Sequence, residues 1–115
     1  MGYVLIHHTG CGSSKKGLAL LEENGVAVEV RKYMSKTERL SDQALRGIAK
    51  KMGKVSPREF LRAKDAEMYG LAETASDDDV LAAMAEEPKL IQRPIGINGR
   101  KAVLGRPNDR LLSIV

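Results

Sequence analysis

Cysteine and aromatic residues are scarce in this chain: its 115 residues include one cysteine, one phenylalanine and no tryptophan. A lone cysteine forms no internal disulfide, and no Cys/His group supplies the four ligands of a structural zinc site. Proteins that bind single-stranded nucleic acid usually stack the bases on aromatic side chains. The composition therefore excludes a disulfide scaffold, predicts no bound metal or cofactor, and disfavours a nucleic-acid partner.

Long hydrophobic runs are also missing. No apolar segment approaches the roughly 20 residues of a membrane-spanning helix, and residues 1–4 lack the basic start and apolar stretch of a signal peptide. We therefore expect a cytoplasmic protein without membrane association. Hydrophobic residues make up 43% of the chain and charged residues 30%, which is ordinary for a globular protein. The net charge of +4 favours an anionic partner.

Hydrophobic patterning predicts a β-α-β unit at the start of the chain. Residues 3–7 form a short apolar run, and residues 14–24 carry an apolar helix face that ends before Gly25. Residues 26–31 then alternate between apolar and polar side chains, as in a strand with one buried face. Because a helix connects the two strands, we expect them to run parallel.

A helical insertion is predicted over about residues 36–87. Ser41, Ser56 and Ser76 each precede a helical pattern and are candidate N-caps. The aspartates after Ser76 suit the first turn of a helix, where the helix dipole favours negative charge. A metal site is the less favoured interpretation of the same acidic run.

A β-β-α unit is predicted to end the chain. Two apolar segments, 90–97 and 101–104, flank Asn98-Gly99, a strong signal for a β-hairpin. A last helix follows through Leu111. The prediction is thus an α/β fold with one mixed sheet, parallel in its first half and antiparallel in its second, in a single domain over residues 1–115.

The lone thiol, Cys11, lies where the first strand gives way to the first helix. Unpaired N–H groups and the helix dipole favour negative charge at a helix start, so this thiol is expected to ionise more readily than a free one. The same N–H groups suit an oxyanion. The alternative is a small buried apolar residue, but the flanking glycines and the serines and lysines that follow favour a reactive thiol.

A cysteine at the first strand-to-helix turn and Pro94 before the third strand resemble the thioredoxin fold, in which this proline is usually cis and lies against the active-site cysteine. Within that fold, the chain resembles the glutaredoxin-linked arsenate reductase family over essentially its whole length. Five segments in the family's order and spacing carry the resemblance: His7-His8-Thr9-Gly10-Cys11-Gly12-Ser13-Ser14-Lys15, Leu20–Gly25, Ser56-Pro57-Arg58 with Leu61-Arg62, Leu90–Ile95 and Leu104–Pro107. His8, Thr9 and Lys15 depart from the family's Asn, Pro and Arg.

The resemblance implies that Cys11 is the nucleophile and that His7 is a neighbour that helps its ionisation. It assigns substrate contacts to Ser14, Lys15, Arg62, Arg93 and Arg106. Planar, permanently charged guanidinium groups suit a tetrahedral anion better than the point charge of lysine. Arg58 is a rival to Arg62, since it lies four residues earlier on the same predicted helix.

The function implied by this resemblance is the reduction of arsenate, with Cys11 attacking arsenic and with glutathione as co-substrate and glutaredoxin as partner. A chain with one cysteine has to take its resolving thiols from outside. Ser14 stands where a CxxC protein carries its second cysteine. Two alternatives stay open: a transcription regulator of the same superfamily that binds RNA polymerase, and a glutathione-dependent thiol reductase with another substrate.

Overall fold

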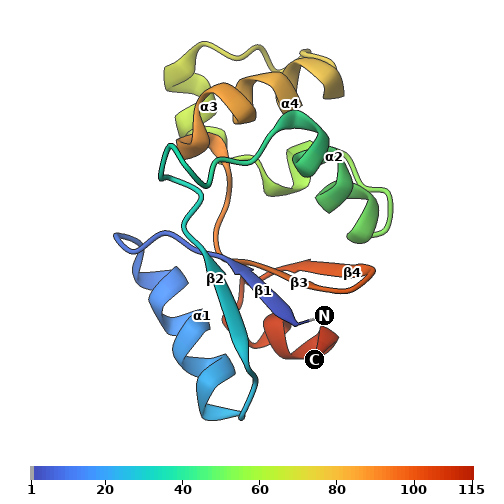
Figure 1. Ribbon diagram of the computed structural model, residues 1–115. Helices are drawn as coiled ribbons and strands as arrows, with labels where there is room; N and C mark the ends of the chain where they lie inside the picture. Colours follow the sequence, from blue (N-terminus) through green and yellow to red (C-terminus); the bar gives the residue numbers. More distant parts are fainter. Residues whose placement is uncertain (1) are drawn as a thin grey trace.

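Four strands form a single mixed sheet in the computed structural model, which describes residues 2–115. The strand order is β2-β1-β3-β4, with β1 parallel to β2 and antiparallel to β3, and β3 antiparallel to β4 (Figure 1). This arrangement confirms the predicted fold class. In chain order the elements are β1 (Tyr3–Ile6), α1 (Gly12–Glu23), β2 (Val28–Arg31), α2 (Asp42–Lys51), η1 (Pro57–Phe60), α3 (Ala63–Tyr69), α4 (Asp77–Glu86), η2 (Pro88–Leu90), β3 (Ile95–Asn98), β4 (Lys101–Leu104) and η3 (Asn108–Ile114), where η marks a 3₁₀ helix.

Side chains of β1 alternate between the two faces of the sheet, and each face has its own core. Tyr3 and Leu5 pack with α1 and η3 around Leu21 and Leu111. Ile6 faces the opposite way, into the larger core that the sheet shares with the helices between β2 and β3. Figure 1 shows α1 on one side of the sheet and α2, α3 and α4 on the other. The end of β1 therefore lies between two separate cores.

The helices between β2 and β3 begin where the serines predict. Ser41, Ser56 and Ser76 are the N-caps of α2, η1 and α4, and each side-chain oxygen accepts an N–H of its own helix. These bonds satisfy N–H groups that have no partner inside the helix. Within residues 2–115, no helix is long and apolar enough to cross a membrane.

Two aspartates at the start of α4 have partners among the side chains of neighbouring elements. Asp78 pairs with Arg46 at 3.0 Å, and Asp77 accepts the hydroxyl proton of Ser56 at 2.8 Å. No group of three or more His, Cys, Asp or Glu side chains converges as a metal site in the described part of the chain.

The short helix after Ser56 differs from its prediction. It is a 3₁₀ helix that ends at Phe60, because Leu61 forms an antiparallel β-bridge with Ile91. Arg62 therefore leaves this helix and becomes the N-cap of α3. The sequence did not predict α3 as a separate helix, since α3 buries only one side chain and has little apolar periodicity.

The antiparallel part of the sheet is shorter than predicted. η2 ends at Leu90, and β3 begins only at Ile95, so the strand covers the last three residues of the 90–97 segment and Asn98. Asn98 pairs with Lys101, which makes Gly99 and Arg100 the turn residues, one position later than predicted. The last helix is 3₁₀ rather than α. The peptide bond before Pro94 is cis, as the resemblance implied.

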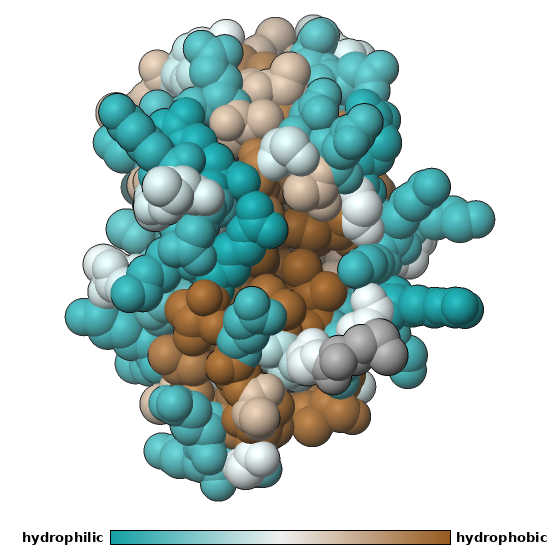
Figure 2. Space-filling model, in the orientation of Figure 1, coloured by the Kyte–Doolittle hydropathy of each residue, from teal (hydrophilic) through white to brown (hydrophobic). Residues whose placement is uncertain are grey.

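Apolar side chains line a hollow between the sheet and α2. Figure 2 shows apolar surface in a recess at this level of the molecule. The hollow has a volume of about 340 Å³ and is lined by Ile6, Ile97 and Ile48, with Arg31 and Lys51 among the other residues. None of the predicted site residues lines it, so it is separate from the chemistry predicted around Cys11.

Gly96 in β3 provides a test of the packing between the sheet and η3. A Cβ at this position would overlap the hydroxyl of Tyr3, which donates to the carbonyl of Leu111 at 2.7 Å. We expect Gly96→Ala to lower the free energy of unfolding by about 1–3 kcal/mol, because the tyrosine has to move. Urea denaturation measures this change.

Gly47→Ala is the matched control, since a Cβ there meets nothing within 4 Å and Gly47 lies inside α2. Alanine is the better helix former by about 0.8–1 kcal/mol, so this variant should be more stable than the wild type. Wild-type stability in Gly96→Ala would contradict the close approach of Tyr3.

Candidate functional site

The candidate site lies at the end of β1, where residues 7–11 lead into α1. Cys11 is the N-cap of α1 and is partly exposed. Its N–H donates to the carbonyl of His8 at 3.0 Å, and its carbonyl accepts the N–H of Lys15 at 3.1 Å. The thiol thus lies at the strand-to-helix junction, beside the free N–H groups of the first helical turn.

Several groups act on the pKa of the Cys11 thiol. Burial raises this pKa, but the N–H of Ser14, the Arg93 side chain and the N–H of Ser13 lower it, and the balance falls below the ordinary value for a thiol. Arg106 adds a further contact, since its Nη2 donates to Sγ at 3.9 Å. The surroundings of the sulfur therefore favour the thiolate, which is the nucleophilic form.

Arg93 is the buried cation of the site, with 9% of its surface exposed. Its Nη1 donates to the carbonyls of Ile91 and Lys89 at 3.2 and 3.3 Å. Its Nε is buried and has no hydrogen-bond partner within residues 2–115. A buried charged N–H without an acceptor is unfavourable, so this edge of the guanidinium suits an anionic ligand beside Cys11.

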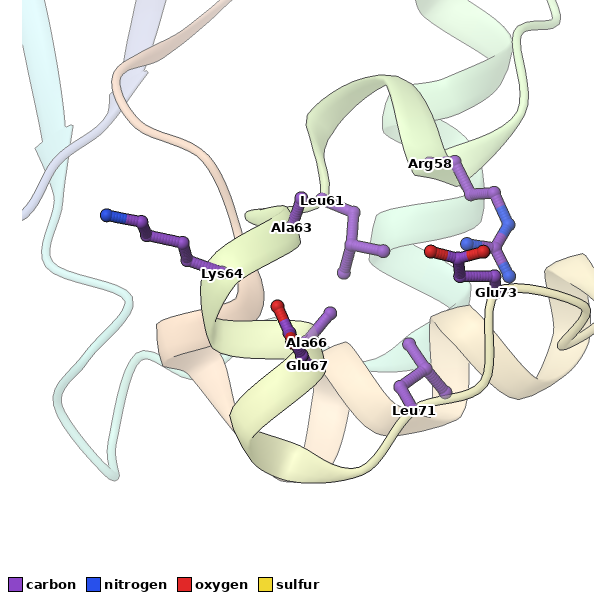
Figure 3. A pocket seen from close by; sticks show the side chains of 8 residues that line it. All are labelled: Arg58, Leu61, Ala63, Lys64, Ala66, Glu67, Leu71 and Glu73. Carbon is purple, nitrogen blue, oxygen red and sulfur yellow. The ribbon is translucent and has the colours of Figure 1, made fainter.

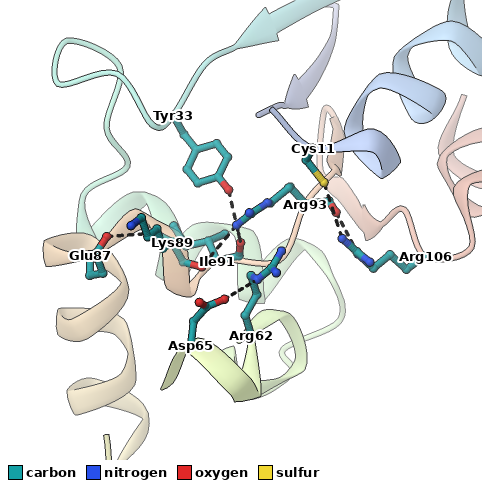
Figure 4. Close-up of polar contacts among 9 residues, drawn as sticks. All are labelled: Cys11, Tyr33, Arg62, Asp65, Glu87, Lys89, Ile91, Arg93 and Arg106. Atoms are coloured by element: carbon teal, nitrogen blue, oxygen red, sulfur yellow. Dashed lines mark hydrogen bonds and ion pairs between the residues drawn. The ribbon is translucent and has the colours of Figure 1, made fainter. Parts of the chain in front are cut away.

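Arg106 and Arg62 are each held by a hydrogen bond or ion pair of their own Nε. Nε of Arg106 donates to the carbonyl of Arg93 at 2.9 Å, and Nε of Arg62 pairs with Asp65 at 2.7 Å. Figure 4 shows Arg93 between Tyr33 and the sulfur, with Arg62 beside it and Arg106 on the other side of Cys11. The structure thus brings together, from three separate segments, the three arginines that the family resemblance assigned to the substrate.

Arg58, the predicted rival of Arg62, has other contacts. Its Nη2 donates to the carbonyls of Ala72 and Ala75 at 3.1 and 2.9 Å. Figure 3 shows it beside Glu73 at a hollow of about 360 Å³ that is also lined by Lys64. The hollow contains none of the five predicted substrate residues, and carboxylates beside its cations make it a poor anion site.

His7 is buried, with 5% of its surface exposed. Burial and the charges of Lys32 and Lys15 lower its pKa, although a backbone contact with Ser14 opposes them. Nδ1 has no hydrogen-bond partner in the described residues, and no hydrogen bond joins the ring to Cys11. The structure therefore favours a neutral His7, which supplies no positive charge to the thiolate.

The two remaining predicted residues lie on α1. Ser14 is fully buried, and its hydroxyl accepts the N–H of His8 at 3.3 Å, so its side chain holds the turn while its N–H faces the sulfur. Lys15 is exposed and acts on the neighbouring His7. Neither side chain has a hydrogen bond to Cys11.

His8, Asp65 and Tyr33 join the site without having been predicted as site residues. His8 places its ring over Gly10, where a Cβ would lie 3.2 Å from Nε2, and its pKa is lowered by burial and by the charges of Arg93, His7 and Arg62. The spacing of Arg62 and Asp65 indicates an i,i+3 pair once α3 is known. No sequence signal indicated Tyr33.

The fold and the site define a thioredoxin-like protein with one cysteine, whose surroundings lower the pKa of its thiol. The chain belongs to the ArsC family, which matches residues 6–114. It is 37% identical to a protein named arsenate reductase from Neisseria meningitidis serogroup A, over 96% of each chain. A namesake from Haemophilus influenzae is 35% identical over the full length of both.

Solved structures agree with this assignment. The arsenate reductase from Vibrio cholerae has a TM-score of 0.89 and 36% sequence identity, and the match covers 100% of this chain and 98% of that one. The family resemblance inferred from the sequence is therefore confirmed.

Cys11 should be alkylated by iodoacetamide at a lower pH than an ordinary thiol, because the reaction follows the thiolate fraction. The folded-state pKa is lowered, so the rate should fall only as the pH drops through a midpoint below that of the same chain unfolded in urea. Mass spectrometry of timed samples gives both curves. Coincident midpoints would contradict the lowered pKa.

Proposed function

We propose that this protein reduces arsenate to arsenite, with glutathione as co-substrate and glutaredoxin as the partner that regenerates the thiol. The observation that carries the proposal is the unpaired, buried Nε of Arg93 in a guanidinium group that acts on the Cys11 sulfur. A nucleophile and a buried guanidinium N–H without a partner in the described residues thus lie together. The names of the relatives from Neisseria and Haemophilus support arsenate as the oxyanion.

Each of the site residues predicted from the sequence has a role in this proposal. Cys11 attacks as the thiolate, and Arg62, Arg93 and Arg106 hold the oxygens of the tetrahedral anion through the nitrogens that the protein leaves free. The N–H groups at the start of α1, including that of Ser14, stabilise the negative charge on the sulfur. Lys15 adds positive charge at the rim.

His7 has a changed role in the proposal. Its lowered pKa and its lack of a hydrogen bond to the sulfur favour a neutral ring that fills the base of the turn. The ionisation of Cys11 then depends on Arg93 and the helix N–H groups, with Arg106 as a further donor.

The proposed reaction balances without any resident cofactor. The Cys11 thiolate forms a bond to arsenic, and one arsenate oxygen leaves as water after taking up two protons. The glutathione thiolate next replaces a second oxygen, which also leaves as water. The two sulfurs on arsenic then join as a disulfide and leave two electrons on arsenic, which goes from the five-valent to the three-valent state and takes water to leave as arsenite.

Regeneration follows from the lone cysteine. The mixed disulfide between Cys11 and glutathione has no internal thiol to displace it, because the chain has no second cysteine. A glutaredoxin thiolate attacks the glutathione sulfur, the Cys11 thiolate leaves, and glutathione passes to glutaredoxin.

Cys11→Ser tests the nucleophile. Arsenate turnover with glutathione and glutaredoxin should fall to background in this variant, because serine forms neither a thiolate nor a disulfide. Arsenite release measures turnover, and wild-type protein without glutaredoxin is the control. Turnover equal to the wild type would reject the mechanism. A wild-type protein that reduces glutathione mixed disulfides but not arsenate would favour the other-substrate alternative.

Lysine substitutions test the guanidinium groups. Arg93→Lys and Arg106→Lys keep the charge but lose the paired donors, so kcat/KM for arsenate should fall roughly 10- to 100-fold, the value of one charge-assisted hydrogen bond. Arg46→Lys is the matched control, because Arg46 is exposed and pairs with Asp78 instead. Equal activity in all three variants would show that charge alone binds the anion.

A further inference from the structure

Tyr33 is a fully buried tyrosine beside Arg93, and the proposed reaction gives it no role. It follows β2, and its N–H donates to the carbonyl of Arg31 at 3.0 Å. Its hydroxyl donates to the carbonyl of Ile91 at 3.3 Å. The same carbonyl accepts Nη1 of Arg93 at 3.2 Å. One backbone oxygen therefore receives a donor from each of two side chains that are far apart in the sequence.

We propose that Tyr33 is a positioning residue, which holds the Ile91 carbonyl in place and thereby fixes the direction of the Arg93 guanidinium toward Cys11. This inference rests on the proposed function, because it gives Arg93 its task. Arginine loses substantial rotamer freedom when it is fixed in one orientation. A rigid acceptor on one edge reduces the freedom left to lose when an anion binds to the other edge.

The bridge at Ile91 leaves the carbonyl of this residue to side-chain donors, because the hydrogen bonds across the bridge use the carbonyls of Leu90 and Phe60. The segment around Ile91 joins η2 to β3, and its sheet-like contact is a single isolated bridge with Leu61. A backbone carbonyl has two lone pairs, so it accepts from Tyr33 and Arg93 together. The hydroxyl of Tyr33 thus links this irregular segment to the loop that follows β2.

The chemistry of Tyr33 suits positioning better than proton transfer. Burial raises the pKa of its phenol, and the charges of Arg93 and Arg62 only partly oppose this. The phenol therefore stays protonated at neutral pH and remains a donor. A neutral hydroxyl adds no negative charge that would compete with the oxyanion for Arg93.

Tyr33→Phe tests the inference, because it removes the hydroxyl and keeps the ring. The midpoint of Cys11 alkylation against pH should shift upward, since a less fixed Arg93 stabilises the thiolate less. KM for arsenate should rise roughly 3- to 10-fold, the size of one neutral hydrogen bond, with a smaller change in kcat. Iodoacetamide labelling and steady-state kinetics give the two readouts.

Tyr3→Phe is the matched control. Tyr3 is also buried, and its hydroxyl also donates to a backbone carbonyl, that of Leu111 at 2.7 Å, within the core on the α1 side of the sheet. Both variants lose one buried hydrogen bond and some stability. Only Tyr33→Phe should move the alkylation midpoint and KM. Equal shifts in both variants, or no shift in Tyr33→Phe, would overturn the inference.

A double-mutant cycle provides the second test. If Tyr33 acts through Arg93, then Tyr33→Phe adds nothing to KM or to the alkylation midpoint in the Arg93→Lys background. Full additivity would overturn the inference. Failure of the proposed function is recognised separately, because the alkylation midpoint is measured without arsenate. A wild type that does not reduce arsenate, with the midpoint shift of Tyr33→Phe intact, rejects the reaction and keeps the positioning role.

Discussion

Each of the three guanidinium groups near Cys11 is held along one edge by an acceptor from the protein itself. Backbone carbonyls hold Arg93 and Arg106, and the carboxylate of Asp65 holds Arg62. The carbonyls fix direction without cancelling charge, so the cations stay available to the thiolate and to an anion. Preorganised donors of this kind stabilise charge without further rearrangement. The proposed anion site depends on this arrangement, and within it Arg93 acts together with the N–H of Ser14 to lower the pKa of the thiol.

The contact between η1 and the segment before β3 brings the site together. The N–H of Arg62 donates to the carbonyl of Leu90, and the N–H of Gln92 donates to that of Phe60, both at 2.7 Å. These two short hydrogen bonds flank the isolated bridge between Leu61 and Ile91. They align Arg62 with Arg93, although the sequence separates the two by a helical stretch. The helices between β2 and β3 therefore contribute Arg62 to the proposed site at the end of β1.

The sequence predicted what local patterns control. The alternation of β2, the glycine after α1 and the serine caps such as Ser41 are all local signals, and the structure contains them. Cys11 at a strand-to-helix turn followed from the same patterns. The end of η1 at Phe60 could not be predicted, because a bridge to a distant segment sets it. The place of Tyr33 in the site could not be predicted for the same reason, since its hydroxyl donates to the carbonyl of a residue 58 positions away.

The residues of the proposed site belong to elements that pack in two different cores. Cys11 begins α1, which packs on one face of the sheet, whereas Arg62 begins α3, among the helices on the other face. Cooperative units of a protein open with different free energies. If the helices on the second face opened as one such unit, Arg62 would move with them, whereas the α1 N–H groups that act on the sulfur belong to the other face. The proposed hold on an oxyanion would then weaken, and the thiol would keep the part of its acidity that comes from the helix N–H groups.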